Sequence, residues 1–113
     1  MMSSRGEIVL VPVPFTDLSS AKRRPVIVIS NDQYNSSLED IVAVAMTSNP
    51  HPAKYSFVIT SADLVAGTLK RPSRVRVDKI YTLSQRIIVK RFGSVNDPRL
   101  DRIRQMLLDL CSP

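Results

Sequence analysis

Two side chains with a chemistry suited to phosphate stand at the ends of neighbouring apolar segments. Arg24 comes directly before Pro25, whose ring restricts the backbone, so its guanidinium would project from a rigid strand end. Thr47 follows the apolar run IVAVAM and brings a hydroxyl to the end of the next segment. A guanidinium and a hydroxyl can both donate hydrogen bonds to phosphate oxygens. Position alone nevertheless favours a plainer interpretation, in which Arg24 is an ordinary surface charge and Thr47 caps a strand.

The other usual catalytic groups are scarce in this chain. His51 is the only histidine, and its place between two prolines in a loop favours a solvated imidazole or a substrate contact over a base. The acidic residues are scattered, apart from the adjacent Glu39 and Asp40, so no cluster of metal-binding carboxylates is expected. Three glycines and one cysteine, Cys111, argue against a glycine-rich phosphate loop and a thiolate metal site. We therefore expect no metal and no cofactor.

The composition is that of one ordinary globular domain covering residues 1–113, with 43% hydrophobic and 23% charged residues. No apolar run reaches the roughly 20 residues of a membrane span, and no secretion signal opens the chain, so a cytoplasmic protein is expected. The net charge is +6, and arginine greatly outnumbers lysine. Such a surface suits a polyanion, although charge alone gives nucleic-acid binding no more weight than a plain solvated surface.

The spacing of apolar residues predicts six short strands followed by one helix. The expected strands are Glu7 to Val13, Pro25 to Ser30, Asp40 to Thr47, Tyr55 to Thr60, Ser73 to Asp78, and Ile87 to Val95 with a bulge or bend at Gly93. Asp97 as N-cap, followed by Pro98, predicts a helix start, and the apolar stripe of this helix would consist of Leu100, Ile103, Met106, Leu107, Leu110 and a buried Cys111. The expected fold is therefore mainly β, a strongly bent barrel or sheet closed by one amphipathic helix.

The segment SRVRVD alternates arginine with valine. Since side chains two apart on a strand point to the same face, the valines would pack in a core while Arg74 and Arg76 would lie side by side on the other face. The alternation thus predicts a pair of guanidinium groups on a fixed scaffold.

Taken in order, these segments resemble the MazF/PemK family of toxins. The opening RGEIVLVPVPFTDLSSAKRRPVIVISND is similar to the family's first strand after Arg-Gly-Asp/Glu, its long loop, its Arg-Pro and its Ser-Asn-Asp, here Arg5 to Glu7, Arg24 with Pro25, and Ser30 to Asp32. IVAVAMTS is similar to the third strand, which ends in Thr or Ser, and SRVRVDKIYTLSQRII to the segment with an Asp, a following Thr and an Arg. The resemblance covers nearly the whole chain.

The resemblance implies a fold, an activity and partners. The fold would be an SH3-like barrel of the MazF/PemK/CcdB type with a C-terminal helix. The activity would be that of a type II toxin–antitoxin toxin, a metal-independent endoribonuclease acting on single-stranded RNA. Toxins of this family form homodimers, bind RNA in a groove across the dimer, and are blocked by a cognate MazE-like antitoxin, which the net charge of +6 predicts to be acidic.

The resemblance also assigns roles to individual residues. The family's catalytic arginine falls on Arg24 and its strand-end Thr or Ser on Thr47, which reverses the plainer interpretation of both. An Arg and an Asp two residues apart, which serve the site in some members, fall on Arg76 and Asp78. The expected RNA-binding side chains are Phe15, Arg23, Asn31, Arg74, Arg76 and Lys79.

The first long loop, PFTDLSSAKRRP, departs from the glycine-rich, acidic loop of many members and is like that of a subgroup with Pro-Phe-Thr-Asp at this point. Phe15 within it could stack on an unpaired base or plug the barrel end, and the sequence gives the two roles equal weight. The preferred RNA sequence is therefore not predicted.

A metal-free cleavage can use the 2′-OH of the RNA as nucleophile, which leaves a 2′,3′-cyclic phosphate and a 5′-OH end. Arg24 would neutralise the developing charge, and Thr47 would hydrogen-bond a non-bridging oxygen. Arginine is a poor proton shuttle because its pKa exceeds about 12, so Asp78 stays open as the base. Two alternatives remain, a CcdB-like toxin that poisons gyrase by binding it and a noncatalytic RNA-binding barrel.

Overall fold

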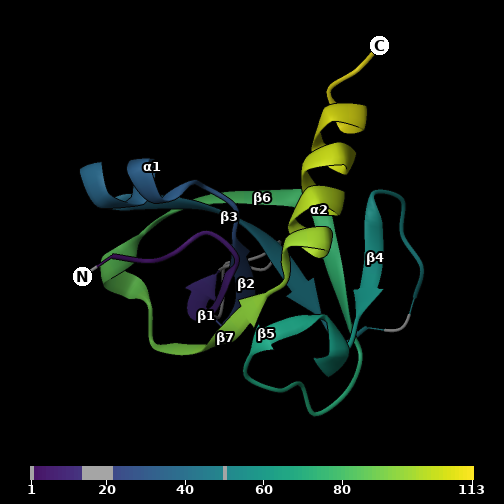
Figure 1. The fold of residues 1–113 in the computed structure, drawn as a ribbon, viewed down its shortest axis with the longest axis horizontal. Coiled ribbons are helices and arrows are strands. Elements are labelled where there is room, and N and C mark those ends of the chain that lie inside the picture. Colours follow the sequence, from purple (N-terminus) through teal and green to yellow (C-terminus); the bar gives the residue numbers. More distant parts are fainter. Residues whose placement is uncertain (1, 14–21, 50) are drawn as a thin grey trace.

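A computed structural model describes residues 2–13, 22–49 and 51–113 and arranges them as an antiparallel sheet with a helix packed against it (Figure 1). The strands are β1 (Glu7–Val13), β2 (Lys22–Val28), β3 (Asp40–Thr47), β4 (Ser56–Ile59), β5 (Leu64–Ala66), β6 (Ser73–Ser84) and β7 (Lys90–Val95). The helices are α1 (Asp32–Ser37) and α2 (Asp97–Leu110), and 3-10 turns occupy Ser61–Asp63 and Gln85–Ile87. The strand order is β4-β6-β3-β2-β1-β7-β5.

The mainly β prediction is confirmed, and β1 and β3 have the predicted bounds. The strand predicted to end at Ser30 ends at Val28, because Asn31 soon begins α1 by accepting a hydrogen bond from the N–H of Tyr34 at 2.8 Å. The sequence analysis did not predict this short helix. The strand predicted to end at Asp78 continues to Ser84, since its second half remains paired with β3.

Buried side chains form two clusters, one on each face of the layer of β1, β2 and β3. The helix-side core packs beneath α2 and consists of Ile8, Ile27, Val44, Met46, Phe57, Ile59, Val75, Val77, Val95, Leu100 and Ile103. The second core lies on the opposite face and consists of Val9, Val11, Val26, Val28, Ile41 and Ala43, with Tyr81, Leu83, Ile87 and Ile88 packed against it. Successive strand side chains point to opposite faces, which explains the split. The sheet curls so that the second half of β6 and the turn after it cover the second core.

Helix α2 closes the helix-side core, as predicted. It begins after Asn96, whose side-chain oxygen accepts a hydrogen bond from a backbone N–H of the first turn at 3.1 Å. The predicted N-cap, Asp97, is therefore wrong by one residue, because Asn96 already occupies the capping position. Leu100 and Ile103 are buried, whereas Cys111 is exposed, contrary to prediction, because it follows the last turn as the C-cap.

A register shift bends the pairing of β1 with β7. Ile8 pairs with Gly93 while Val9 pairs with Arg91, which leaves one residue of β7 unpaired and confirms the predicted bulge at Gly93. A Cβ on Gly93 would lie 2.1 Å from the carbonyl oxygen of Ala66. The absence of a side chain at Gly93 is therefore what lets β5 approach β7 closely.

Candidate functional site

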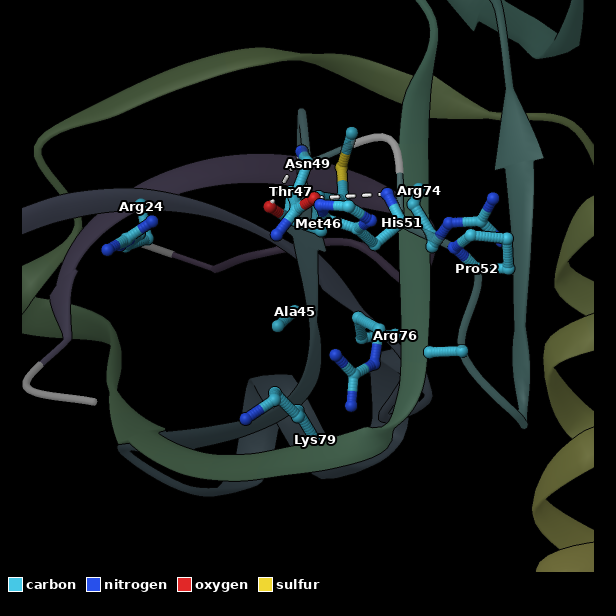
Figure 2. A pocket seen from close by; sticks show the side chains of 11 residues that line it. Arg24, Ala45, Met46, Thr47, Asn49, His51, Pro52, Arg74, Arg76 and Lys79 are labelled. Atoms are coloured by element: carbon cyan, nitrogen blue, oxygen red, sulfur yellow. Dashed lines mark hydrogen bonds between the residues drawn. The ribbon is translucent and has the colours of Figure 1, made fainter. Parts of the chain in front are cut away.

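A pocket of about 190 Å³ lies at the edge where β2 begins, β3 ends and β6 begins (Figure 2). Its lining consists of Arg24, Ala45, Met46, Thr47, Asn49, His51, Pro52, Ala53, Arg74, Arg76 and Lys79. In Figure 2, Arg24 lies on one side of Thr47, and Arg74 and Arg76 lie on the other. Four of the lining side chains are cations, so the pocket is a strongly basic cavity.

Arg24, Thr47 and Arg74 form a row across three adjacent strands. Thr47 of β3 pairs directly with Arg74 of β6. On the other side of β3, Val26 pairs with Ala45, and the same register continued by two residues places Arg24 opposite Thr47. Side chains at paired positions of an antiparallel sheet point to the same face, with Cβ atoms about 4.5–5.5 Å apart. The sheet thus fixes two guanidinium groups on either side of one hydroxyl.

The row of Arg24, Thr47 and Arg74 lies at the open end of the second core. Arg24 shares a strand face with Val26, and Thr47 shares one with Ala43 and Ala45, because residues two apart point the same way. Along this face of β2, the side chain changes from the fully buried, apolar Val26 to the charged Arg24 within two residues. A rigid apolar layer therefore supports the base of a charged cavity.

A bulge in β6 brings Lys79 into the same pocket as Arg76. Ala45 pairs with Arg76 while Val44 pairs with Ile80, so three residues of β6 lie between two consecutive pairs. Strict alternation would place Arg76 and Lys79 on opposite faces, and the extra residues change the phase so that both line the cavity. The bulge therefore adds a fourth cation to a site that a regular strand could not supply.

The Thr47 hydroxyl is held by the segment that follows β3. Its Oγ1 accepts a hydrogen bond from the N–H of Asn49 at 3.1 Å, and the side-chain oxygen of Asn49 accepts one from the N–H of His51 at 3.0 Å (Figure 2). Both bonds use oxygen lone pairs. The hydroxyl proton of Thr47 thus remains available for donation, since a hydroxyl can accept and donate at once.

Arg76 is held by a bidentate ion pair with Asp78. Its Nε and Nη2 donate to the two carboxylate oxygens, each at 2.9 Å. The hydrogen bond from Arg76 lowers the pKa of the Asp78 carboxyl, and the same bond raises the pKa of Arg76. Asp78 does not line the pocket. The carboxylate is therefore ionised at neutral pH and orients the guanidinium from outside the cavity.

Arg74 is oriented by β4. Its Nη1 donates to the hydroxyl of Ser56 at 3.0 Å, and that hydroxyl donates in turn to the carbonyl oxygen of Ala53. The Nε of Arg74 is buried and donates to no acceptor among the residues that the structure describes. One end of this guanidinium is thus fixed while a buried donor stays available to a ligand.

Tyr81 is a neighbour of the site that the sequence analysis overlooked. Burial against the second core raises the pKa of its phenol, and the charges of Arg24 and Arg76 lower it by smaller amounts. The phenol therefore lies close enough to both guanidinium groups to feel their charge. The one signal for Tyr81 in the sequence is its spacing, because it is two residues beyond Lys79 on the same strand.

The predicted site residues separate into those that meet in the pocket and those that do not. Arg24, Thr47, Arg74, Arg76 and Lys79 line it together. Beside that group, Arg23 is exposed and points away from it, because adjacent strand residues alternate in direction. Asn31 caps α1 beyond the opposite end of β2. The prediction for Phe15 falls outside the described residues.

Two further lining residues come from the segment between β3 and β4. Asn49 was not singled out in the sequence, and His51 was interpreted as a solvated imidazole or a substrate contact. A breaker-rich run such as SNPHP marks a loop but does not indicate its direction. The structure turns it back over the end of β3, so both residues reach the pocket.

Nothing in the described part of the chain gathers three or more His, Cys, Asp or Glu side chains as a metal site would. Within the same ranges, no helix has the length and apolar character needed to cross a membrane.

A family model described as the PemK-like, MazF-like toxin of type II toxin–antitoxin systems matches residues 4–111. The chain is 37% identical over 117 residues to the endoribonuclease MazF2 of Mycobacterium bovis, a match that covers 97% of this chain and 100% of the relative. The endoribonuclease MazF6 of Mycobacterium tuberculosis matches with the same identity and coverage. These similarities run through every element that builds the pocket.

Solved structures show the same fold. A mycobacterial endoribonuclease in complex with its cognate antitoxin superposes with a TM-score of 0.73 at 24% identity, covering 98% of this chain and 99% of that one. A MazE–MazF complex from Deinococcus radiodurans gives a TM-score of 0.74 at 22% identity, with coverage of 97% and 96%. The curled sheet with its terminal helix is therefore an architecture already observed by crystallography.

Proposed function

The chain belongs to the PemK-like, MazF-like toxins of type II toxin–antitoxin systems, and we propose that the pocket between β2, β3 and β6 is the site where it cleaves RNA. The protein is a toxin endoribonuclease. The observation that carries the site assignment is the row of Arg24, Thr47 and Arg74, in which a hydroxyl donor stands between two guanidinium groups at the open end of a rigid core.

The row suits a phosphate in the act of cleavage. Arg24 and Arg74 would bind the scissile phosphate and stabilise the charge that grows on its oxygens as the 2′-OH attacks. Thr47 would donate its proton to a non-bridging oxygen, because the bond from the N–H of Asn49 uses a lone pair and leaves the hydroxyl proton available. The products would carry a 2′,3′-cyclic phosphate and a 5′-OH.

Arg76 and Lys79 would bind the neighbouring phosphates. An extended RNA strand carries one negative charge per nucleotide, and a groove lined with cations follows such a backbone. Asp78 fits this arrangement as a positioning residue for Arg76. A carboxylate whose pKa is lowered by an arginine is a weak base, so the proposal gives Asp78 no proton-transfer role.

The family suggests the partners and the location. We infer that residues 1–113 act as one toxin domain, that two copies form a homodimer, and that an acidic antitoxin covers the basic pocket. Single-stranded RNA is the proposed substrate and the cytoplasm the proposed location. Phe15, Arg23 and Asn31 remain proposed RNA contacts, and of these Arg23 and Asn31 lie away from the pocket lining.

The test is cleavage of single-stranded RNA by the purified protein in EDTA, with analysis of the product ends. We expect cyclic phosphate and 5′-OH ends, and we expect Arg24→Ala to cleave at least about a hundredfold more slowly. Arg104→Ala, an exposed arginine on α2, should cleave at the wild-type rate. A requirement for a divalent metal, 3′-OH products, or an unimpaired Arg24→Ala variant would overturn the proposal, and RNA binding without cleavage would identify a noncatalytic module.

A further inference from the structure

Cleavage by a 2′-OH requires a group that accepts its proton, and the described residues that line the pocket offer few acceptors. Arginine and protonated lysine carry donors only. The side-chain oxygens of Thr47 and Asn49 already accept backbone N–H bonds, and neither oxygen is basic. Asp78 is outside the lining and paired with Arg76. Of the described side chains that line the pocket, His51 is the one with an imidazole, whose neutral form carries a basic lone pair on a ring nitrogen.

The structure ties His51 to the catalytic row. The N–H of His51 donates to the Asn49 side chain at 3.0 Å, and the N–H of Asn49 donates to the Thr47 hydroxyl at 3.1 Å. Through this chain of two hydrogen bonds, the backbone of His51 is held near the proposed phosphate contact. His51 lines the same pocket as Thr47 and Arg74, and Figure 2 draws it beside them. A base has to stand within one proton transfer of the 2′-OH, next to the phosphate.

We propose that His51 is the general base of the reaction, an inference that rests on the proposed function. A neutral ring nitrogen of His51 takes the proton as the 2′-O–H bond breaks, and the 2′-oxygen forms a bond to phosphorus. The bond from phosphorus to the 5′-oxygen then breaks, and the 5′-oxygen leaves with a proton from solvent. The imidazolium returns its proton to solvent, so the enzyme is unchanged after each turnover.

The charged groups that face His51 come from two strands. Arg24 lies on β2, and Arg74, Arg76 and Lys79 lie on β6, with Asp78 behind Arg76. The pH dependence of the rate is therefore compared between wild type and variants that lack the imidazole but keep all of these charged groups.

The first experiment measures single-turnover cleavage of a short RNA by wild type, His51→Ala and His51→Gln between pH 5 and about 8. We expect the wild-type rate to rise about tenfold per pH unit at the acidic end, and both variants to lack this rise and to cleave about a hundredfold or more slowly at neutral pH. Added imidazole should restore part of the rate to His51→Ala. Wild-type rates with an unchanged pH profile in both variants would overturn the proposal.

A second substrate separates a base from an acid. In RNA with a bridging 5′-sulfur at the cleavage point, the thiolate leaves without a proton, so an enzyme that lacks only its general acid recovers. We expect His51→Ala to remain as slow on this substrate as on ordinary RNA. Recovery to the wild-type rate would make His51 an acid and would overturn its assignment as the base.

Binding and folding controls complete the test. Affinity for a 2′-deoxy analogue, which cannot be cleaved, should be the same for His51→Ala and wild type, and a loss of affinity as large as the loss of rate would make His51 a binding residue only. His51 is exposed, so thermal unfolding should be unchanged. Lys54→Ala, a neighbouring exposed residue outside the lining, serves as the matched control. A wild-type protein that fails to cleave RNA contradicts the proposed function, whereas an active wild type with active His51 variants contradicts only this inference.

Discussion

The layer of β2 and β3 carries polar side chains at both of its ends, and the two ends differ in charge and in hydrogen bonding. At one end, the pocket gathers four cations around the Thr47 hydroxyl. At the other end lies a closed polar cluster of neutral groups, which consists of Ser3, Ser30, Asn35 and Gln85. Cations at an open cavity suit a ligand, whereas neutral groups bonded to one another suit a folded core.

The closed polar cluster is bonded largely within itself and to nearby backbone, and the Ser3 hydroxyl also accepts a hydrogen bond from Arg91 at 3.1 Å. Gln85 accepts from the N–H of Ser3 at 2.8 Å and donates to the carbonyl oxygens of Asn35 and Leu38 at 2.8 and 3.1 Å. Asn35 accepts from the hydroxyl of Ser30 and donates to its carbonyl oxygen. The cluster joins the N-terminal segment, α1 and the turn after β6. Buried polar groups with all partners present stabilise one arrangement of these segments.

The two hydroxyls show the same contrast. Ser30 Oγ accepts from the N–H of Val42 at 3.0 Å, as Thr47 Oγ1 accepts from that of Asn49. Ser30 then donates its proton to Asn35, whereas the Thr47 proton meets no acceptor within residues 2–13, 22–49 and 51–113. The acceptor of the hydroxyl proton therefore distinguishes a hydroxyl that stabilises the fold, such as Ser30, from one that can bind a ligand, such as Thr47.

The largest expected effect is at Thr47. Thr47→Val keeps the shape of the side chain and removes the donor, so we expect cleavage to slow by about a hundredfold or more. Thr47→Ser keeps the donor and should retain most of the activity. Single-turnover rates and thermal unfolding are measured together. A fully active Thr47→Val variant would show that the Thr47 proton is not needed for cleavage and would contradict the distinction from Ser30.

Gln85→Ala should have the opposite signature. It leaves the N–H of Ser3 and the carbonyl oxygens of Asn35 and Leu38 without their partner, and we expect the free energy of unfolding to fall by about 2–4 kcal/mol. The folded fraction should still cleave RNA at the wild-type rate. Urea unfolding checks the first expectation, with the exposed Gln105→Ala as control, and a slower native enzyme would show that the closed cluster also serves the site.

Lys79→Ala tests whether the pocket contacts the RNA backbone beyond the cleaved phosphate. We expect weaker binding of a noncleavable RNA and a plot of log affinity against log salt whose slope is shallower by about 0.7. Fluorescence anisotropy over a salt series measures both. An unchanged slope would place Lys79 away from the phosphates.

Asp78→Asn should have the smallest effect. The hydrogen bond from Arg76 lowers the pKa of Asp78 below the usual 3.8, so its ionised form stabilises the fold above that pH and the contribution disappears as the pH falls through the lowered value. Because the pair is partly exposed, we expect a loss of at most about 1 kcal/mol at neutral pH, and a difference from wild type that shrinks as the pH falls below 3.8. Urea unfolding over a pH series from neutral downwards measures both.

The sequence predicted the parts of the site that follow from strand geometry. Arg24 and Thr47 were singled out as residues at strand ends, but only the resemblance to the MazF/PemK family gave them a functional role. The pair of Arg74 and Arg76 followed from the alternation of side chains along a strand. The apolar residues of the strands follow the same alternation, so the mainly β fold could also be predicted from the sequence.

The rest depended on features with no local signal. The bulge that turns Lys79 into the pocket arises from the pairing of β6 with β3, which is a long-range contact. The path of the segment that contains His51 depends on hydrogen bonds to Thr47 and not on its own residue types. The resemblance assigned both Arg76 and Asp78 to the site without predicting their ion pair, and that pair is why we propose Asp78 as a positioning residue and not as the base.

The row of Arg24, Thr47 and Arg74 is carried by strands, while the segment with Asn49 and His51 connects them. Strand spacing is set by backbone hydrogen bonds and changes little when side chains are replaced, whereas connecting segments tolerate substitution and changes of length. The phosphate-binding half of the proposed site is thus fixed by strand pairing, whereas the proposed base stands on a segment that can change. Descendants of one such protein could keep the same phosphate contacts while the group that takes up the proton is exchanged.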